Sequence, residues 1–129
     1  MSSIRAKQIQ ALAWAVLTTV ALVLPGRPDD ELPGWIPESL EPIADKLVHT
    51  LLFFVLVILL HRAVTQETGT QESRSRGWFL SILVSTGILV VVLEIAQLWV
   101  PHRMFEPLDI LAGLAGALAA GVVIVAKYR

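Results

Sequence analysis

The feature that most constrains this chain is a succession of four long apolar runs, separated by polar or proline-rich segments. A helix needs about 20 apolar residues to cross the hydrocarbon core of a bilayer, which is roughly 30 Å thick. Four such helices and their connections use up most of the 129 residues, of which 55% are hydrophobic and only 16% charged. The sequence therefore predicts an all-α, polytopic bundle of four transmembrane helices without a soluble domain.

Prolines and polar clusters mark the ends of the runs. No small-residue cleavage pattern follows the first run, so we expect a retained signal-anchor helix rather than a cleaved signal peptide. The predicted helices cover about residues 9–24, 45–61, 78–100 and 108–126. The predicted connections are a proline-rich, acidic external loop over 25–44 and a polar cytoplasmic loop over 62–77. The whole chain, 1–129, is expected to form one domain.

The distribution of Lys and Arg predicts the orientation of the bundle. Seven basic residues fall on one side of this topology, namely Arg5, Lys7, Arg62, Arg74, Arg76, Lys127 and Arg129. Only Arg27, Lys46 and Arg103 fall on the other side. Cytoplasmic segments of membrane proteins carry an excess of Lys and Arg. Both termini are therefore predicted to lie in the cytoplasm.

The fourth run is rich in small residues that recur every four positions. This spacing lets helix backbones approach closely and dock in a membrane. We favour packing within the four-helix monomer and keep a homo-oligomer face as the alternative. The residues concerned are Gly113, Gly116, Ala117, Ala120 and Gly121.

Polar residues gather at the predicted external ends of the second and third helices. Asp45 and His49 are four residues apart and share a helix face, with Lys46 beside them. Glu94 and Gln97 are three residues apart and share a face of the third helix. At about 1.5 Å per residue, His49 lies roughly 6 Å and Glu94 roughly 9 Å below the external helix ends. Because these depths are similar, we expect the two side chains to meet.

The tight connection between the third and fourth helices brings two more groups to this end, Arg103 and Asp109. Glu94 is the most informative residue, because a carboxylate in hydrocarbon costs at least a few kcal/mol. We expect it to face the bundle interior. There it is either neutral, or ionised and paired with Lys46, Arg103 or a protonated His49.

These residues allow several uses. A catalytic site would employ His49, Glu94 or Asp109 as acid or base at a lipid or sugar head group. A proton or ion path across the membrane would need more than one buried Glu near one face. The remaining alternative is a satisfied network of hydrogen bonds and ion pairs that sets the helix register.

Other chemistries lack a signal in this sequence. Asp45, His49, Glu94 and Asp109 offer oxygen and imidazole ligands for a metal ion, but there is no compact metal motif such as His-Glu-x-x-His and the chain has no Cys. We therefore predict no metal. No glycine-rich phosphate loop, nucleophile elbow or nucleic-acid patch is present, so we expect neither a cofactor nor a nucleic-acid partner.

In its ordered polar residues the chain resembles the VanZ-like family of bacterial integral membrane proteins. The match is carried by Asp45-Lys46-x-x-His49, by Glu94-x-x-Gln97-x-x-x-Pro101-x-Arg103, and by Asp109 with Gly116 following it. The resemblance covers most of the chain from the first helix onward. One position departs from the pattern, because Gly113 stands where the family commonly has Asn.

The resemblance implies a multi-pass protein of the bacterial plasma membrane, in a family whose namesake is linked to low-level resistance to the glycopeptide teicoplanin. It implies no reaction. We therefore expect an envelope protein that recognises a membrane lipid or a lipid-linked cell-wall precursor at the outer side of the membrane. The predicted binding residues are Asp45, Lys46, His49, Glu94, Gln97, Arg103 and Asp109. The alternatives are an acid/base enzyme in which Arg103 holds an anionic head group, and an assembly partner in a membrane complex.

Overall fold

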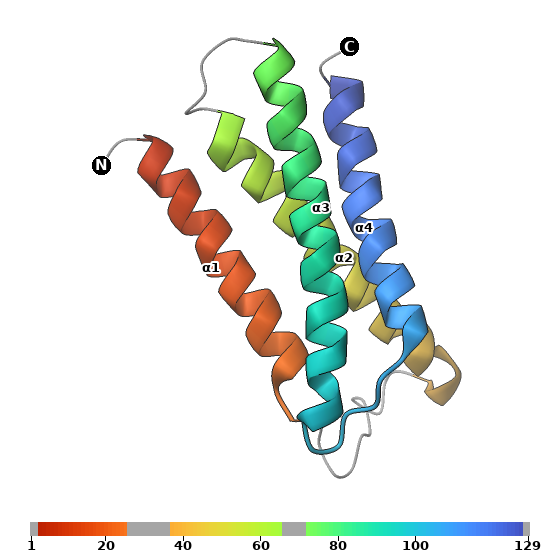
Figure 1. The fold of residues 1–129 in the computed structure, drawn as a ribbon. Coiled ribbons are helices and arrows are strands. Elements are labelled where there is room, and N and C mark those ends of the chain that lie inside the picture. Colours follow the sequence, from red (N-terminus) through yellow and green to blue (C-terminus); the bar gives the residue numbers. More distant parts are fainter. Residues whose placement is uncertain (1–2, 26–36, 66–71, 128–129) are drawn as a thin grey trace.

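A computed structural model describes residues 3–25, 37–65 and 72–127, which form helices and no strand (Figure 1). The four long helices are α1 (Ser3–Val23), α2 (Glu41–Thr65), α3 (Glu72–Ala96) and α4 (Pro107–Lys127). Two single 3-10 turns flank them, η1 (Glu38–Leu40) before α2 and η2 (Gln97–Trp99) after α3. Most of the predicted external loop, at 26–36, and part of the predicted cytoplasmic loop, at 66–71, lie outside the described residues.

All four helices are long and apolar enough to cross a membrane, which confirms the predicted all-α, four-span fold. They contain 21 or 25 residues each, or about 31 to 38 Å at 1.5 Å per residue. Their outward faces carry exposed Leu, Val and Ile side chains along the whole bundle. Such a surface suits contact with lipid chains, because burying apolar side chains away from lipid gives no hydrophobic free energy.

The predicted loop boundaries at both ends of α2 are wrong. Residues 41–44, assigned to the external loop, form the first turn of α2, and residues 62–65, assigned to the cytoplasmic loop, form its last turn. Hydropathy detects only the part of a helix that lies in hydrocarbon, whereas backbone hydrogen bonding continues into the interface. Pro42 does not prevent this extension, because a first-turn residue needs no N–H partner within the helix.

The ends of α1 and α3 also differ from the prediction. α1 begins at Ser3 and α3 at Glu72, each six residues before the predicted start, because their polar first turns continue the helix beyond the apolar run. At its other end α3 stops at Ala96, and the tighter turn η2 replaces the last residues of the predicted helix. Val100 then adopts an extended conformation. This turn redirects the chain toward α4.

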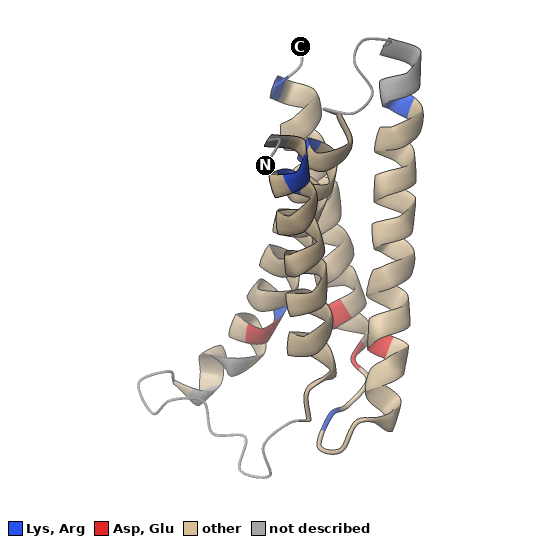
Figure 2. Ribbon diagram, turned by 90° about the vertical axis from the view of Figure 1, so that its left-hand side faces the viewer, with Lys and Arg blue, Asp and Glu red and all other residues tan. Residues whose placement is uncertain are grey.

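The helices alternate in direction, so both chain ends lie at one end of the bundle, here called the termini end (Figure 1). Most Lys and Arg residues gather near it, and the Asp and Glu residues of the ribbon lie toward the opposite end (Figure 2). The predicted topology likewise places most Lys and Arg residues on the side of the two termini. The cytoplasmic location of the termini stays a prediction from the positive-inside rule.

α2 packs most extensively against α4, and two glycines make this approach possible. A Cβ added to Gly116 would collide with the carbonyl oxygen of Thr50 and lie 2.9 Å from its carbonyl carbon. A Cβ added to Gly113 would lie 2.9 Å from side-chain atoms of Phe53 and of Val90. The small-residue face of α4 is therefore occupied by α2 and α3 of the same chain, as the favoured prediction has it.

Two side chains add polar links between helices at the level of the membrane. The Thr50 hydroxyl lies 2.9 Å from the carbonyl oxygen of Lys46 in its own helix and 3.1 Å from that of Ala112 in α4. The indole N–H of Trp14 donates to the carbonyl of Leu52, which ties α1 to α2 at 2.9 Å. Such interhelical hydrogen bonds contribute about 0.6 kcal/mol each in membrane proteins.

We expect Gly116→Ala to lower the stability of the bundle by about 1–3 kcal/mol, because the new methyl group must push α2 away from α4. Gly77→Ala is the matched control, since a Cβ there meets nothing within 4 Å and Ala favours the helix. Unfolding of both variants in detergent micelles measures the difference. A Gly116→Ala variant as stable as Gly77→Ala would contradict the close contact.

Candidate functional site

Six ionisable residues from three segments meet at the bundle end opposite the termini. We call them the polar cluster, which consists of Asp45, Lys46 and His49 on α2, Glu94 on α3, Glu106 just before α4, and Asp109 on α4. Every Asp and Glu within the four candidate spans belongs to it. The acidic groups of the membrane-spanning part are thus concentrated in one place.

Lys46 links the exposed and the buried parts of the cluster. Its Nζ lies 2.5 Å from Oε2 of Glu106 and 2.5 Å from Oδ1 of Asp109, and 3.5 Å from Oδ2 of Asp45. The side chains of Asp45 and Glu106 are close to half exposed, whereas that of Asp109 is only 5% exposed. One ammonium group therefore neutralises part of the charge of three carboxylates and reaches into the interior.

His49 is fixed by its own helix and points its second nitrogen at two acids. Nδ1 lies 3.1 Å from the backbone oxygen of Asp45, and because a carbonyl can only accept, Nδ1 carries the proton. Nε2 is buried and has no hydrogen-bond partner among the described residues. Its nearest acidic atoms are Oδ2 of Asp109 at 3.9 Å and Oε2 of Glu94 at 4.0 Å.

Glu94 faces the bundle interior, as its insertion cost requires, and is 2% exposed. Its Oε1 accepts a hydrogen bond of 2.8 Å from the backbone N–H of Glu106. This bond attaches α3 to the connection that leads into α4. The sequence suggested Lys46, Arg103 or His49 as an ionic partner of Glu94. Of these three, the structure gives a contact only with His49, whose Nε2 lies 4.0 Å from Oε2 of Glu94, beyond hydrogen-bond distance.

Arg103 does not join the polar cluster, contrary to its predicted place in the binding site. Its Nε donates to the carbonyl of Leu24 at 3.2 Å, and its Nη2 donates to that of Ala21 at 3.3 Å. Ala21 lies in the last turn of α1 and Leu24 directly follows that helix, where carbonyl groups lack intrahelical partners. Arg103 therefore caps α1, because the turn after η2 directs its side chain toward that helix.

Gln97 is buried in η2, but the structure gives no hydrogen bond between it and the polar cluster. Its Nε2 lacks a partner among the described residues. Glu94 and Gln97 are both buried, as their three-residue spacing leads one to expect, but Gln97 begins the 3-10 turn η2 instead of continuing α3.

Glu106 is a member of the polar cluster that the sequence analysis did not single out. It stands three residues before Asp109, and its carbonyl accepts from the backbone N–H of Asp109 at 2.9 Å. Residues three apart lie on the same face of a helical turn. This spacing is the sequence signal that could have placed Glu106 and Asp109 on the same face at the start of α4.

The charge of the polar cluster limits what it can bind. It contains four carboxylates and one ammonium, a formal charge of −3 when the acids are ionised and His49 is neutral. Like charges repel a phosphate, whereas a cation or a hydrogen-bond donor is attracted. The arrangement therefore suits cationic groups, amines and hydroxyls better than anions.

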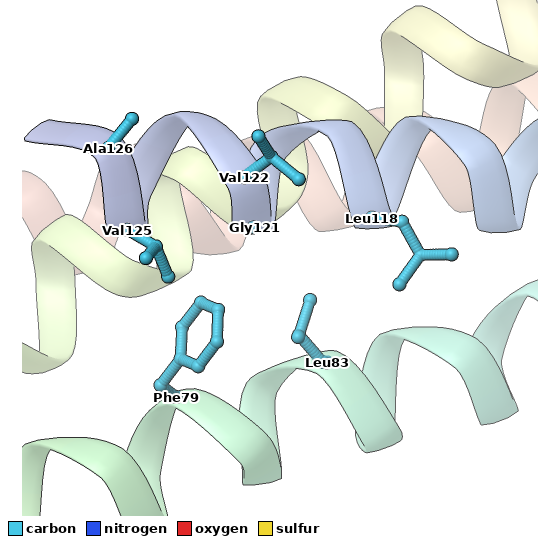
Figure 3. Close-up of a pocket in the computed structure, with 7 residues that line it drawn as sticks. All are labelled: Phe79, Leu83, Leu118, Gly121, Val122, Val125 and Ala126. Atoms are coloured by element: carbon cyan, nitrogen blue, oxygen red, sulfur yellow. The ribbon is translucent and has the colours of Figure 1, made fainter.

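A separate apolar pocket lies between α3 and α4, toward the termini end (Figure 3). Its volume is about 430 Å³. It is lined by Phe79, Leu83, Leu118, Gly121, Val122, Val125 and Ala126. Because none of these side chains is polar, the pocket offers contact to lipid chains but no groups for chemistry.

Comparisons of the chain with protein-family models, with curated proteins and with solved structures found no match. Membership of the VanZ-like family therefore stays a prediction based on the ordered polar residues described above.

We expect Lys46→Met to destabilise the bundle by about 3 kcal/mol, because it leaves the buried carboxylate of Asp109 without its counter-charge. The double variant Lys46→Met/Asp109→Leu removes both partners and should recover most of this loss. Thermal unfolding in detergent micelles compares the two. A single variant no less stable than the double variant would contradict this account of Lys46.

Proposed function

We propose that this chain is a VanZ-like protein of the bacterial plasma membrane, which recognises a lipid-linked cell-wall precursor or a membrane lipid through the polar cluster. The observation that carries the proposal is the graded exposure of the cluster. Asp45 and Glu106 are close to half exposed at the bundle end, and Lys46 connects them to the buried Asp109. Buried His49 and Glu94 lie beyond Asp109. Charged groups at this membrane depth mark functional sites by default.

The predicted orientation supports a ligand on the outer side of the membrane. If the basic termini end faces the cytoplasm, the exposed carboxylates face the compartment in which cell-wall precursors are assembled. The proposed link to glycopeptide susceptibility rests on this position and on the family resemblance.

The charge of the cluster supports recognition through ammonium and hydroxyl groups of the precursor rather than through its phosphates. The enzyme alternative required Arg103 to hold an anionic head group, and that guanidinium is bonded to α1 instead. The assembly alternative required the small-residue face of α4, and that face packs inside the chain. We therefore advance the binding function alone.

Native mass spectrometry of the full chain in detergent tests binding directly. The probes are a lipid-linked disaccharide-peptide precursor and the same polyprenyl chain carrying only a phosphate. We expect the precursor to bind more tightly. Asp45→Asn/Glu106→Gln should weaken its binding about 10-fold, as expected for the loss of about 1.4 kcal/mol. Arg103→Gln, outside the cluster at the same bundle end, is the control.

Equal binding of the two probes, or an unaffected double variant, would refute head-group recognition by these acids. Because both substituted side chains are partly exposed, the double variant is expected to remain folded. Its unfolding temperature verifies this.

Expression in a teicoplanin-susceptible bacterium tests the envelope role. We expect the wild-type chain to reduce susceptibility and the Asp45→Asn/Glu106→Gln variant to have no effect. Growth inhibition assays, with membrane levels of both proteins matched, measure the difference. Unchanged susceptibility with the wild-type chain present in the membrane would remove the resistance role.

A further inference from the structure

Two acidic side chains lie close to Nε2 of His49 in the interior of the polar cluster. Nε2 of His49 lies 4.0 Å from Oε2 of Glu94 and 3.9 Å from Oδ2 of Asp109, and all three side chains are at least 95% buried. These separations are too long for direct hydrogen bonds. Nε2 of His49 therefore lies beside two carboxylates without a hydrogen bond to either.

Each of the three residues uses its other polar atom to hold its position. Nδ1 of His49 donates to the carbonyl of Asp45, Oε1 of Glu94 accepts from the N–H of Glu106, and Oδ1 of Asp109 pairs with Lys46. With Nδ1 protonated, Nε2 of a neutral imidazole presents a lone pair. A neutral imidazole in this tautomer therefore leaves its buried lone pair beside two acidic side chains.

We propose that His49, Glu94 and Asp109 bind a divalent first-row metal ion, such as Zn²⁺ or Mn²⁺. Imidazole and carboxylate ligands suit these ions, with bonds of about 2.0–2.2 Å. Two ligands on one such ion can stand at most about 4.4 Å apart, so the separations of 3.9 and 4.0 Å fit within its reach. The imidazole ligand favours them over Ca²⁺ and Mg²⁺.

Asp45 is a fourth candidate ligand. Asp45, His49 and Asp109 each offer one ligand atom, and these atoms lie within 4.8 Å of one another. Oδ1 of Asp45 lies 4.0 Å from Nδ1 of His49, and Asp45 is the most exposed of the four candidate ligands. An ion here would be approached from the bundle end.

Charge and surroundings support the same assignment. A divalent ion would reduce the formal charge of the cluster from −3 to −1, and it would replace repulsion between buried carboxylates by attraction. Metal-bound His residues usually donate their other nitrogen to a carbonyl or a carboxylate, as Nδ1 of His49 does. The sequence prediction of no metal rested on the absence of a compact motif, whereas these ligands come from three separate helices.

The ion site shares its residues with the proposed binding function but does not require a lipid ligand. The full chain, purified in detergent and stripped with a chelator, is titrated with Zn²⁺ or Mn²⁺ alone. We expect one ion per chain by elemental analysis and a higher unfolding temperature with metal. His49→Gln and Glu94→Gln should each weaken binding about 100-fold. His102→Asn, at a left-handed turn residue outside the cluster (φ 58°), is the matched control because Asn tolerates that conformation.

A spectroscopic readout keeps the test independent of variant folding. Electron paramagnetic resonance of the Mn²⁺-loaded wild-type chain should show coupling to one imidazole nitrogen. A stripped chain that takes up neither ion, uptake without imidazole coupling, or equal uptake by a folded His49→Gln variant would each overturn the proposal. Ion uptake without precursor binding overturns only the proposed function, whereas precursor binding by a metal-free chain that takes up no ion overturns only the metal site.

Discussion

The close contact between α2 and α4 is the constraint on which the rest of the structure depends. Gly116 lets the backbone of α4 approach the backbone of Thr50, and the Thr50 hydroxyl reaches the carbonyl of Ala112 at the same level. Lys46 stands one turn before Thr50, and Asp109 stands two turns before Gly116. The contact therefore places the ammonium of α2 beside the buried carboxylate of α4, within 2.5 Å. A wider separation of the two helices would leave both charges in hydrocarbon without partners, which is the costlier state.

The buried charges are held largely by backbone groups and by one another. Glu94 accepts from a backbone N–H at the start of the α4 segment, and His49 donates to a carbonyl of its own helix. Backbone partners hold a side chain at small entropic cost, because the backbone is already ordered by the helix or turn. Nε2 of His49 is left without a hydrogen-bond partner among the described residues, 4.0 Å from Oε2 of Glu94. A network that served stability alone would pair this nitrogen, since an unsatisfied buried polar group is costly.

The four spans and the core of the polar cluster could be predicted from sequence, because both depend on local periodicity. Apolar run length sets the spans, and the helical repeat with similar depths brings Glu94 toward His49. Arg103 and Glu106 could not be placed in this way. Both lie in the connection after η2, whose path depends on where α1 ends and on how α3 and α4 pack. The helix ends were also misplaced, because hydropathy does not report how far backbone hydrogen bonding extends into the interface.

Gly113 shows how packing can decide the depth of a polar site. VanZ-like proteins commonly have Asn at this position, one turn deeper than Asp109, where an amide would extend the polar cluster into the membrane. In this chain a Cβ at Gly113 would already lie 2.9 Å from Phe53 and Val90. The space that an amide would need is thus filled by an aromatic ring and a branched side chain, both nearly completely buried. Apolar packing therefore borders the buried part of the cluster, whereas its more exposed carboxylates, Asp45 and Glu106, lie at the bundle end.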